Sequence, residues 1–192
     1  LWLCHRAVRE FVITVTFGAV SDTGKLRNAN EDSFLVGAHL LAVADGMGGH
    51  LHGEQAASLI IETFIESFGQ YAQPRIADPK AFISDIMNYA HERIMKFPHD
   101  FALGGFPGST CVTALIQDGR MYWGHAGDSR LYVLRDGKVL TRTHDHSMVY
   151  QWVEWGIITP EEARIHPQRN QITNCLGGAE DMFDMEPGKP VA

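Results

Sequence analysis

Two hydrophobic periods follow one another along this chain in blocks, and their order limits the fold more than any other feature of the sequence. Apolar residues first recur at every second position, then at steps of three and four, and then at every second position again. Period two is typical of strands, and steps of three and four are typical of one helix face. Because the elements come in blocks, we expect an α+β fold rather than a parallel sheet with alternating helices. The first predicted elements are a strand over 11–20, a hairpin over 33–44 and helices over 54–69 and 79–96.

Particular residues mark the ends of these elements. Asp78 followed by Pro79 is typical of a helix start, and Gly69 is typical of a helix stop. The run Leu40–Ala44 is apolar at every position. A continuous apolar run predicts that the second strand of the hairpin is buried on both faces.

Two Asp-Gly pairs, Asp118-Gly119 and Asp136-Gly137, predict two further hairpins after the helices, because each pair is set between alternating apolar runs. The strand pairs predicted around these turns are 110–117 with 120–125 and 129–135 with 138–143. Two hairpins in succession predict an antiparallel meander. Helical signals return over 147–164, and 172–176 is predicted to be a short strand or helix.

Composition excludes several classes of protein. Hydrophobic residues make up 45% of the chain and charged residues 20%, which excludes a disordered, collagen-like or coiled-coil chain. The net charge of −7 argues against nucleic acid or a membrane as a partner, because phosphate groups bind basic surfaces. The three cysteines, Cys4, Cys111 and Cys175, lie far apart and predict a reducing compartment. No apolar run approaches the roughly 18 residues of a membrane helix, and residues 1–10 lack a secretory core, so we expect a cytoplasmic protein.

The strongest chemical signal is an apolar strand that ends in Asp45-Gly46-Met47-Gly48-Gly49-His50. Three interpretations are open: a structural turn, a phosphate-binding loop before a helix, and a site for a hard metal ion. The absence of a following Gly-Lys-Ser/Thr disfavours the phosphate loop. In the metal interpretation, Asp45 and the carbonyl group of Gly46 are ligands of Mg²⁺ or Mn²⁺, which prefer oxygen.

A second polar segment, Arg27–Asp32, holds an arginine and two adjacent acids. Taken alone, it is typical of an exposed turn. Because the strands that start at Asp32 and end at Asp45 are predicted to form a hairpin, Glu31 and Asp45 are expected at one end of the sheet. Together with Arg27 they predict a metal site beside a phosphate-binding arginine.

Two later segments also carry polar groups. Gly124–Arg130 is a strand that runs into a glycine-rich corner with one acid, Asp128. His144 and His146 are two residues apart and could hold zinc, although histidines in a turn more often cap the chain or form hydrogen bonds.

Six motifs appear in one order that resembles the metal-dependent protein serine/threonine phosphatases of the PPM family (type 2C), in their bacterial form. The resemblance covers Phe11–Gly178. The motifs are Arg27-x-x-Asn30-Glu31-Asp32, Asp45–His50, Gly108-Ser109-Thr110, Gly127-Asp128-Ser129-Arg130, Asp145-His146-Ser147 and Asn170-Gln171-Ile172-Thr173-x-x-Leu176-Gly177.

The resemblance implies a four-layer α-β-β-α sandwich of two antiparallel sheets flanked by helices. It implies that Asp45 bridges two Mn²⁺ or Mg²⁺ ions, which Glu31 and the Gly46 carbonyl also coordinate. Asp128 matches the aspartate of a third, weaker metal site. Arg27 matches the arginine that holds the substrate phosphate.

The implied reaction is attack by metal-activated water on phosphoserine or phosphothreonine. An acid must protonate the leaving oxygen, and His50 is one candidate for that role. The implied partners are phosphoproteins made by a serine/threonine kinase.

The domain expected from the resemblance runs over 11–192, after an N-terminal extension over 1–10, and 147–169 forms a flap that shapes substrate access. Family members continue past the counterpart of Gly177 and supply two more metal aspartates there, so the resemblance implies a domain truncated at its C-terminus. Two functions follow: an active protein phosphatase, or a catalytically incomplete fragment or pseudophosphatase that binds phosphoproteins. The presence of Arg27, Glu31, Asp45 and Asp128 together favours the first.

Overall fold

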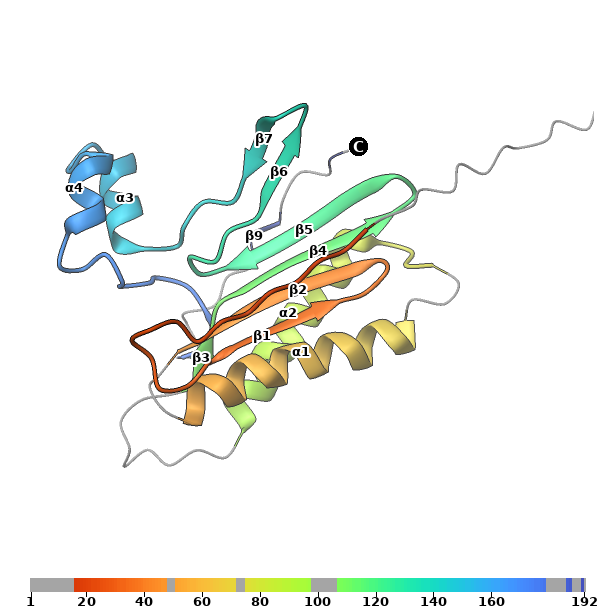
Figure 1. Ribbon diagram of the computed structural model, residues 1–192. Coiled ribbons are helices and arrows are strands. Elements are labelled where there is room, and N and C mark those ends of the chain that lie inside the picture. Colours follow the sequence, from red (N-terminus) through yellow and green to blue (C-terminus); the bar gives the residue numbers. More distant parts are fainter. Residues whose placement is uncertain are drawn as a thin grey trace, which may run out of the picture.

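A single antiparallel sheet of seven strands organises the computed structural model, which describes residues 16–47, 51–71, 75–97, 107–178, 186–187 and 191 (Figure 1). The order across the sheet is β8-β3-β2-β4-β5-β9, and β1 pairs with β2 as well. The strands are β1 (Asp32–Val36), β2 (Leu40–Met47), β3 (Gly108–Ser109), β4 (Cys111–Gln117), β5 (Arg120–Ala126), β8 (Leu176–Gly177) and β9 (Glu186–Pro187).

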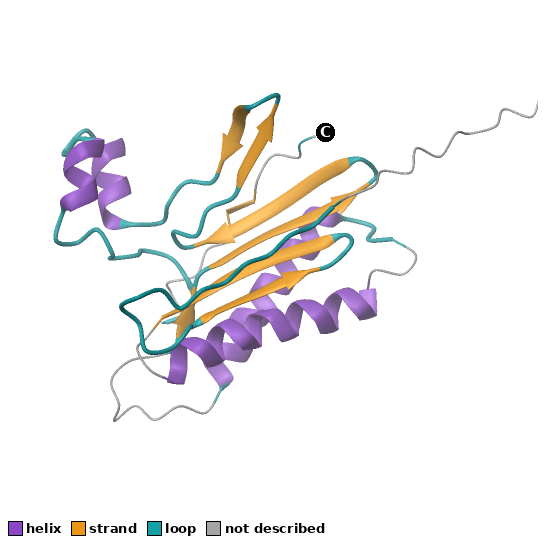
Figure 2. Ribbon diagram, viewed as in Figure 1, coloured by secondary structure: helices purple, strands orange, loops and turns teal. Residues whose placement is uncertain are grey.

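Two long helices, α1 (Leu51–Tyr71) and α2 (Pro79–Lys96), cover one face of this sheet (Figure 2). Their apolar stripes pack on the sheet and on each other, and the largest fully buried side chain there is Phe64. The predicted start of α2 is confirmed, because Asp78 caps it by accepting hydrogen bonds from two backbone N–H groups. The predicted stop of α1 is wrong: the helix passes through Gly69, whose Cβ position is open space, and ends at Tyr71.

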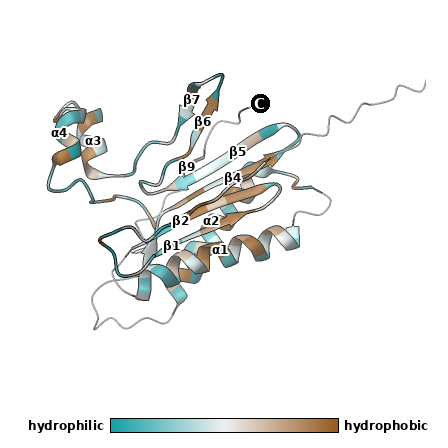
Figure 3. Ribbon diagram, viewed as in Figure 1, coloured by the Kyte–Doolittle hydropathy of each residue, from teal (hydrophilic) through white to brown (hydrophobic). Residues whose placement is uncertain are grey.

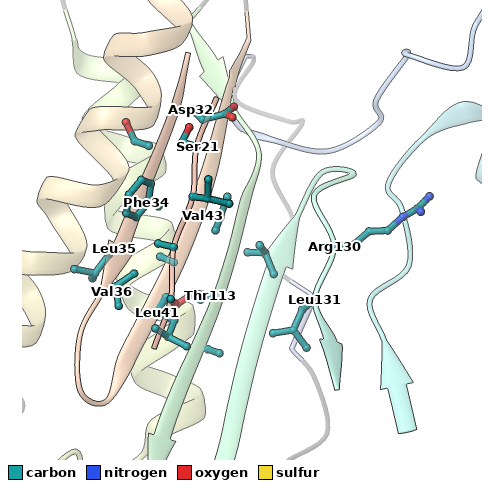
Figure 4. A pocket seen from close by; sticks show the side chains of 17 residues that line it. Ser21, Asp32, Phe34, Leu35, Val36, Leu41, Val43, Thr113, Arg130 and Leu131 are labelled. Carbon is teal, nitrogen blue, oxygen red and sulfur yellow. The ribbon is translucent and has the colours of Figure 1, made fainter. Parts of the chain in front are cut away.

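The other face of the sheet carries exposed apolar side chains in the part of the chain that the structure describes. Phe34, Val36 and Val43 are 45%, 40% and 45% exposed, and they line a hollow of about 380 Å³ (Figure 4). Figure 3 colours β2 mainly as hydrophobic. The prediction that the second strand of the hairpin is buried on both faces is therefore wrong. In β2, buried and exposed positions alternate, because successive side chains point to opposite faces and only one face meets the helices.

The first Asp-Gly hairpin, β4–β5, has the turn that was predicted, with positive φ at both Asp118 and Gly119. The second hairpin is also present, as β6 (Tyr132–Arg135) and β7 (Lys138–Arg142), but the predicted meander is wrong. This hairpin forms its own two-stranded sheet. The chain leaves the main sheet at Gly127, where φ is +103° and where a Cβ atom would lie 2.6 Å from Thr110 Cγ2.

Two short helices, α3 (Met148–Glu154) and α4 (Pro160–Ile165), occupy the segment with predicted helical signals. Neither a helix nor a continuous strand forms over 172–176: Ile172 makes an isolated bridge with Ser147, and β8 begins only at Leu176. The predicted strand over 11–20 is not seen in its described part, since 16–20 is unpaired, and 11–15 lies outside the described residues.

The expected α+β class is thus confirmed, with two antiparallel sheets and flanking helices. Of the helices that the structure describes, none has the length and apolar content needed to cross a bilayer.

Candidate metal and phosphate site

The β1–β2 hairpin gathers acidic groups at one end of the main sheet. Asp32 and Asp45 are direct partners in its antiparallel register, and Glu31 precedes Asp32. The backbone N–H of Gly46 donates to the Glu31 carbonyl oxygen at 3.1 Å. The structure therefore brings together Glu31, Asp45 and Gly46, as the sequence predicted, and adds Asp32, which the sequence analysis did not single out as a site residue.

Two glycines allow the first part of α1 to approach this cluster. A Cβ atom on Gly46 would lie 2.1 Å from the Gly53 carbonyl oxygen, and one on Gly53 would lie 2.8 Å from Glu31 Oε2. Real Cβ atoms do not tolerate such distances, so the backbone contact requires glycine at both positions. Sequence reasoning missed Gly53, although a glycine near the start of a long apolar helix is a usable signal.

Hydrogen bonds from the β3–β4 corner hold the backbone of Asp45 in place. Its carbonyl oxygen accepts from the Thr110 N–H at 2.9 Å and from the Ser109 hydroxyl at 3.0 Å. Its own N–H donates to the Thr110 hydroxyl at 3.1 Å, and that hydroxyl lies 2.6 Å from the Ser129 hydroxyl. Ser129 follows Asp128 directly, so the same hydroxyl pair ties the Asp45 strand to the corner that carries Asp128.

The carboxyl groups of this cluster affect one another electrostatically. Partial burial raises the pKa of Asp45, and the negative charges of Asp32 and Asp128 raise it further. Arg27 is close enough to act in the opposite direction on that pKa. Partial burial also raises the pKa of Asp128. A positive ion bound among these groups would relieve the repulsion that raises the pKa of Asp45.

The donor atoms fit a hard divalent cation, because carboxylate and carbonyl oxygens are the ligands that Mg²⁺ and Mn²⁺ prefer. Within the described ranges, no three acidic, histidine or cysteine side chains lie close enough together to enclose a metal ion. An ion held at Asp45 would be coordinated by such oxygens and by water, which Mg²⁺ characteristically retains.

The histidines that could have formed a zinc pair have other contacts. The His144 carbonyl oxygen lies 2.7 Å from His125 Nε2, and the ring of His144 stacks on Tyr150. The His146 ring stacks on His125, and its Nδ1 accepts a hydrogen bond from the Gly127 N–H at 3.1 Å. These contacts favour the structural interpretation of the two histidines. The candidate acid His50 lies outside the described residues.

Comparison with known proteins identifies related chains. A model of the family described as protein phosphatase 2C matches residues 27–173. The serine/threonine protein phosphatase PstP of Mycobacterium tuberculosis is 39% identical over 173 residues, which are 88% of this chain and 32% of PstP. The protein phosphatase PhpP of Streptococcus pneumoniae is 28% identical over 85% of this chain and 68% of its own length. This chain thus spans about a third of the mycobacterial relative.

Solved structures of the same mycobacterial phosphatase also resemble this chain. The crystal structure of M. tuberculosis PstP matches with a TM-score of 0.74 and 35% identity, over 90% of this chain and 71% of that one. The PstP catalytic domain in complex with two manganese ions matches with a TM-score of 0.72 and 33% identity, over 88% and 70% of the two chains.

Proposed function

Because this chain belongs to the protein phosphatase 2C family, we propose that it takes part in removing phosphate from phosphoserine and phosphothreonine in proteins, with bound Mn²⁺ or Mg²⁺. The observation that carries the proposal is the position of Asp45. Its backbone is held by Ser109 and Thr110, and its carboxyl group stands among acids that raise its pKa, within the electrostatic reach of Arg27.

Four residues of the chain are proposed to hold metal ions. Asp45 would bridge two ions, with Gly46 contributing its carbonyl oxygen and Glu31 coordinating directly or through water. Asp128 would contribute to a third, weaker site. When bound, such ions lower the pKa of coordinated water, so that hydroxide is available near neutral pH. The manganese ions of the related PstP structure support this assignment.

Arg27 is proposed to bind the phosphate group of the substrate. A guanidinium group matches the oxygen geometry of a phosphoryl group and stabilises the charge that builds on it during transfer. The effect of Arg27 on the pKa of Asp45 supports its proximity to the same cluster. His50 is proposed as the acid that protonates the departing seryl or threonyl oxygen.

The phosphatase domain is proposed to run over 11–192, after an extension over 1–10, and the segment 147–169, which contains α3 and α4, is proposed to act as a flap over the substrate. The proposed partners are cytoplasmic proteins phosphorylated by a serine/threonine kinase, with neither nucleic acid nor membrane as a partner.

The first test is hydrolysis of para-nitrophenyl phosphate by the 192-residue chain, with and without Mn²⁺, beside Asp45→Asn. We expect Mn²⁺-dependent turnover that the variant lacks. Turnover that persists in Asp45→Asn would contradict the role of Asp45. A folded chain with no turnover would favour the pseudophosphatase or the incomplete fragment over an enzyme that acts alone.

The role of Arg27 is tested separately with a phosphothreonine peptide. Arg27→Ala should raise KM, whereas Lys25→Ala, which removes an exposed charge two positions away, should leave KM unchanged. An unchanged KM in Arg27→Ala would remove this residue from phosphate binding.

A further inference from the structure

A polar pocket of about 530 Å³ lies between the corner after β5, the end of β7 and the two short helices. Arginines from four different segments line it: Arg130 in the corner, Arg142 at the end of β7, Arg164 in α4 and Arg169 after α4. In Figure 4 the side chain of Arg130 points away from the main sheet. Four positively charged side chains thus converge on one concavity of a chain whose net charge is −7.

Only one of these arginines has a carboxylate partner among the described residues. Arg130 binds Asp145 through two hydrogen bonds, one of them from Nε at 2.6 Å and the other from Nη2. Arg130 also donates a hydrogen bond to the Tyr132 hydroxyl group at 3.4 Å, and this contact, with a smaller effect of Arg142, lowers the pKa of that tyrosine. Arg164 has no hydrogen-bond or ion-pair partner in the part of the chain that the structure describes.

The other two acids of the pocket, Glu154 and Asp128, act on groups other than Arg142 and Arg164. Burial raises the pKa of Tyr150, and the negative charge of the nearby Glu154 raises it further. Asp128 belongs to the acidic cluster of the proposed metal site, since its charge raises the pKa of Asp45. The pocket wall therefore holds four arginines and three acids, and neither Arg142 nor Arg164 has an ion-pair partner among the described residues.

Asp128 also connects this pocket to the proposed catalytic site. It lines the pocket, and its charge acts on Asp45. The pocket therefore begins at the acidic cluster and extends away from it, toward α3 and α4. The pocket and the acidic cluster at Asp45 therefore share Asp128.

Resting on the proposed function, we propose that this arginine pocket is a subsite for an anionic side chain near the phosphorylated residue of the substrate. The ligand is a carboxylate or a second phosphate, both of which accept paired hydrogen bonds from a guanidinium group. The preferred substrates are then acidic or multiply phosphorylated segments. Discrimination comes from the two arginines, because a neutral neighbour would leave their charges without a partner.

The test uses three fluorescein-labelled peptides that share one phosphothreonine and differ only in the neighbouring residues: neutral, aspartate-containing, or carrying a second phosphoserine. The first readout is kcat/KM with Mn²⁺. The second is the Kd of the metal-free chain, measured by fluorescence anisotropy, which does not depend on turnover. We expect the two anionic peptides to bind about tenfold more tightly than the neutral one, as charge-assisted hydrogen bonds allow.

The variants Arg164→Gln and Arg142→Gln/Arg164→Gln should reduce this preference stepwise. Arg164→Gln alone keeps the test valid if removal of Arg142 disturbs folding. The control is Arg120→Gln, an equal loss of charge at the exposed start of β5, outside the pocket, which should retain the full preference.

Equal Kd values for the three peptides, or a preference that survives in both variants, would overturn the subsite. A preference for only one of the anionic peptides would support it and identify the group that it binds. Absence of para-nitrophenyl phosphate turnover would argue against an enzyme that acts alone, and the anisotropy readout still decides whether the subsite exists.

Discussion

Asp32 and Asp45 stand directly opposite each other across the β1–β2 hairpin. Like charges at paired positions of a sheet are destabilising. Partial burial raises the pKa of Asp45 most, and the charge of Asp32 raises it further, as expected from that repulsion. The pairing of these two acids therefore lowers the stability of the metal-free protein.

Asp45→Asn should stabilise the metal-free chain at neutral pH. Because the pKa of Asp45 is raised in the folded state, the folded chain binds this proton more tightly than the unfolded chain. Stability is then lost as the pH rises from the unfolded pKa, near 4, through the folded one. In EDTA at pH 7, we expect the free energy of unfolding of Asp45→Asn to exceed that of the wild type by up to about 1 kcal/mol. Thermal melts at pH 7 and at lower pH should show the difference shrinking with acid.

The matched control for that experiment is Asp85→Asn, an aspartate on the exposed side of α2. It should leave the pH dependence unchanged. If Asp85→Asn gained as much stability as Asp45→Asn, the gain would reflect net charge in general rather than the pairing with Asp32.

Gly53→Ala should destabilise the chain, and Gly69→Ala should not, although both glycines lie in α1. A Cβ atom on Gly53 would meet Glu31 Oε2 at 2.8 Å and the Gly46 carbonyl carbon at 2.9 Å, whereas Gly69 has nothing within 4 Å. The expected cost for Gly53→Ala is about 1–3 kcal/mol. The expected gain for Gly69→Ala is about 0.5–1 kcal/mol. Urea unfolding measures both, and equal effects would contradict the close contact.

Thr110→Val should cost about 1–3 kcal/mol, because it removes the partly buried acceptor of the Asp45 N–H group and the hydrogen bond to Ser129. Thr110→Ser retains the hydroxyl group and serves as the control. It should lose less stability and keep the Mn²⁺ concentration for half-maximal thermal stabilisation near that of the wild type. A Thr110→Ser variant as unstable as Thr110→Val would show that the methyl group, rather than the hydroxyl group, is what matters.

Cys111 and Cys175 should resist alkylation in the folded chain. Burial raises the pKa of the Cys111 thiol to about 12 and that of Cys175 to about 11, so little thiolate exists at pH 8. Iodoacetamide treatment followed by peptide mass spectrometry should find both residues unmodified in buffer and modified in guanidinium chloride. Rapid modification of either thiol in buffer would mean that its surroundings open readily.

Local preferences made much of the fold predictable. The turn at Asp118-Gly119 requires positive φ at both residues, and Asp-Gly supplies it. Asp78 before Pro79 determines the start of α2 in the same local way. The separation of β6–β7 from the main sheet was not predictable, because it depends on the packing of Gly127 against Thr110, a contact between distant positions.

In the candidate site too, local patterns predicted some residues, whereas contacts between distant segments determined others. Placing Glu31 near Asp45 required only the expectation of a hairpin. Asp32 was missed as a site residue because its partner depends on the register, which a local pattern does not specify. Gly53 was missed because its neighbours, Gly46 and Glu31, come from other elements.

The β6–β7 hairpin carries its own ladder of backbone hydrogen bonds, and no strand of the main sheet pairs with it in the described residues. Its tip, Asp136-Gly137, is exposed, and there is open space around Gly137. Foreign sequence inserted at this turn would therefore leave both the seven-stranded sheet and the Asp45 cluster intact. Because β7 runs from this turn to Arg142 on the pocket wall, a fluorescent reporter placed at the turn would lie at the far end of a strand whose other end lines the arginine pocket.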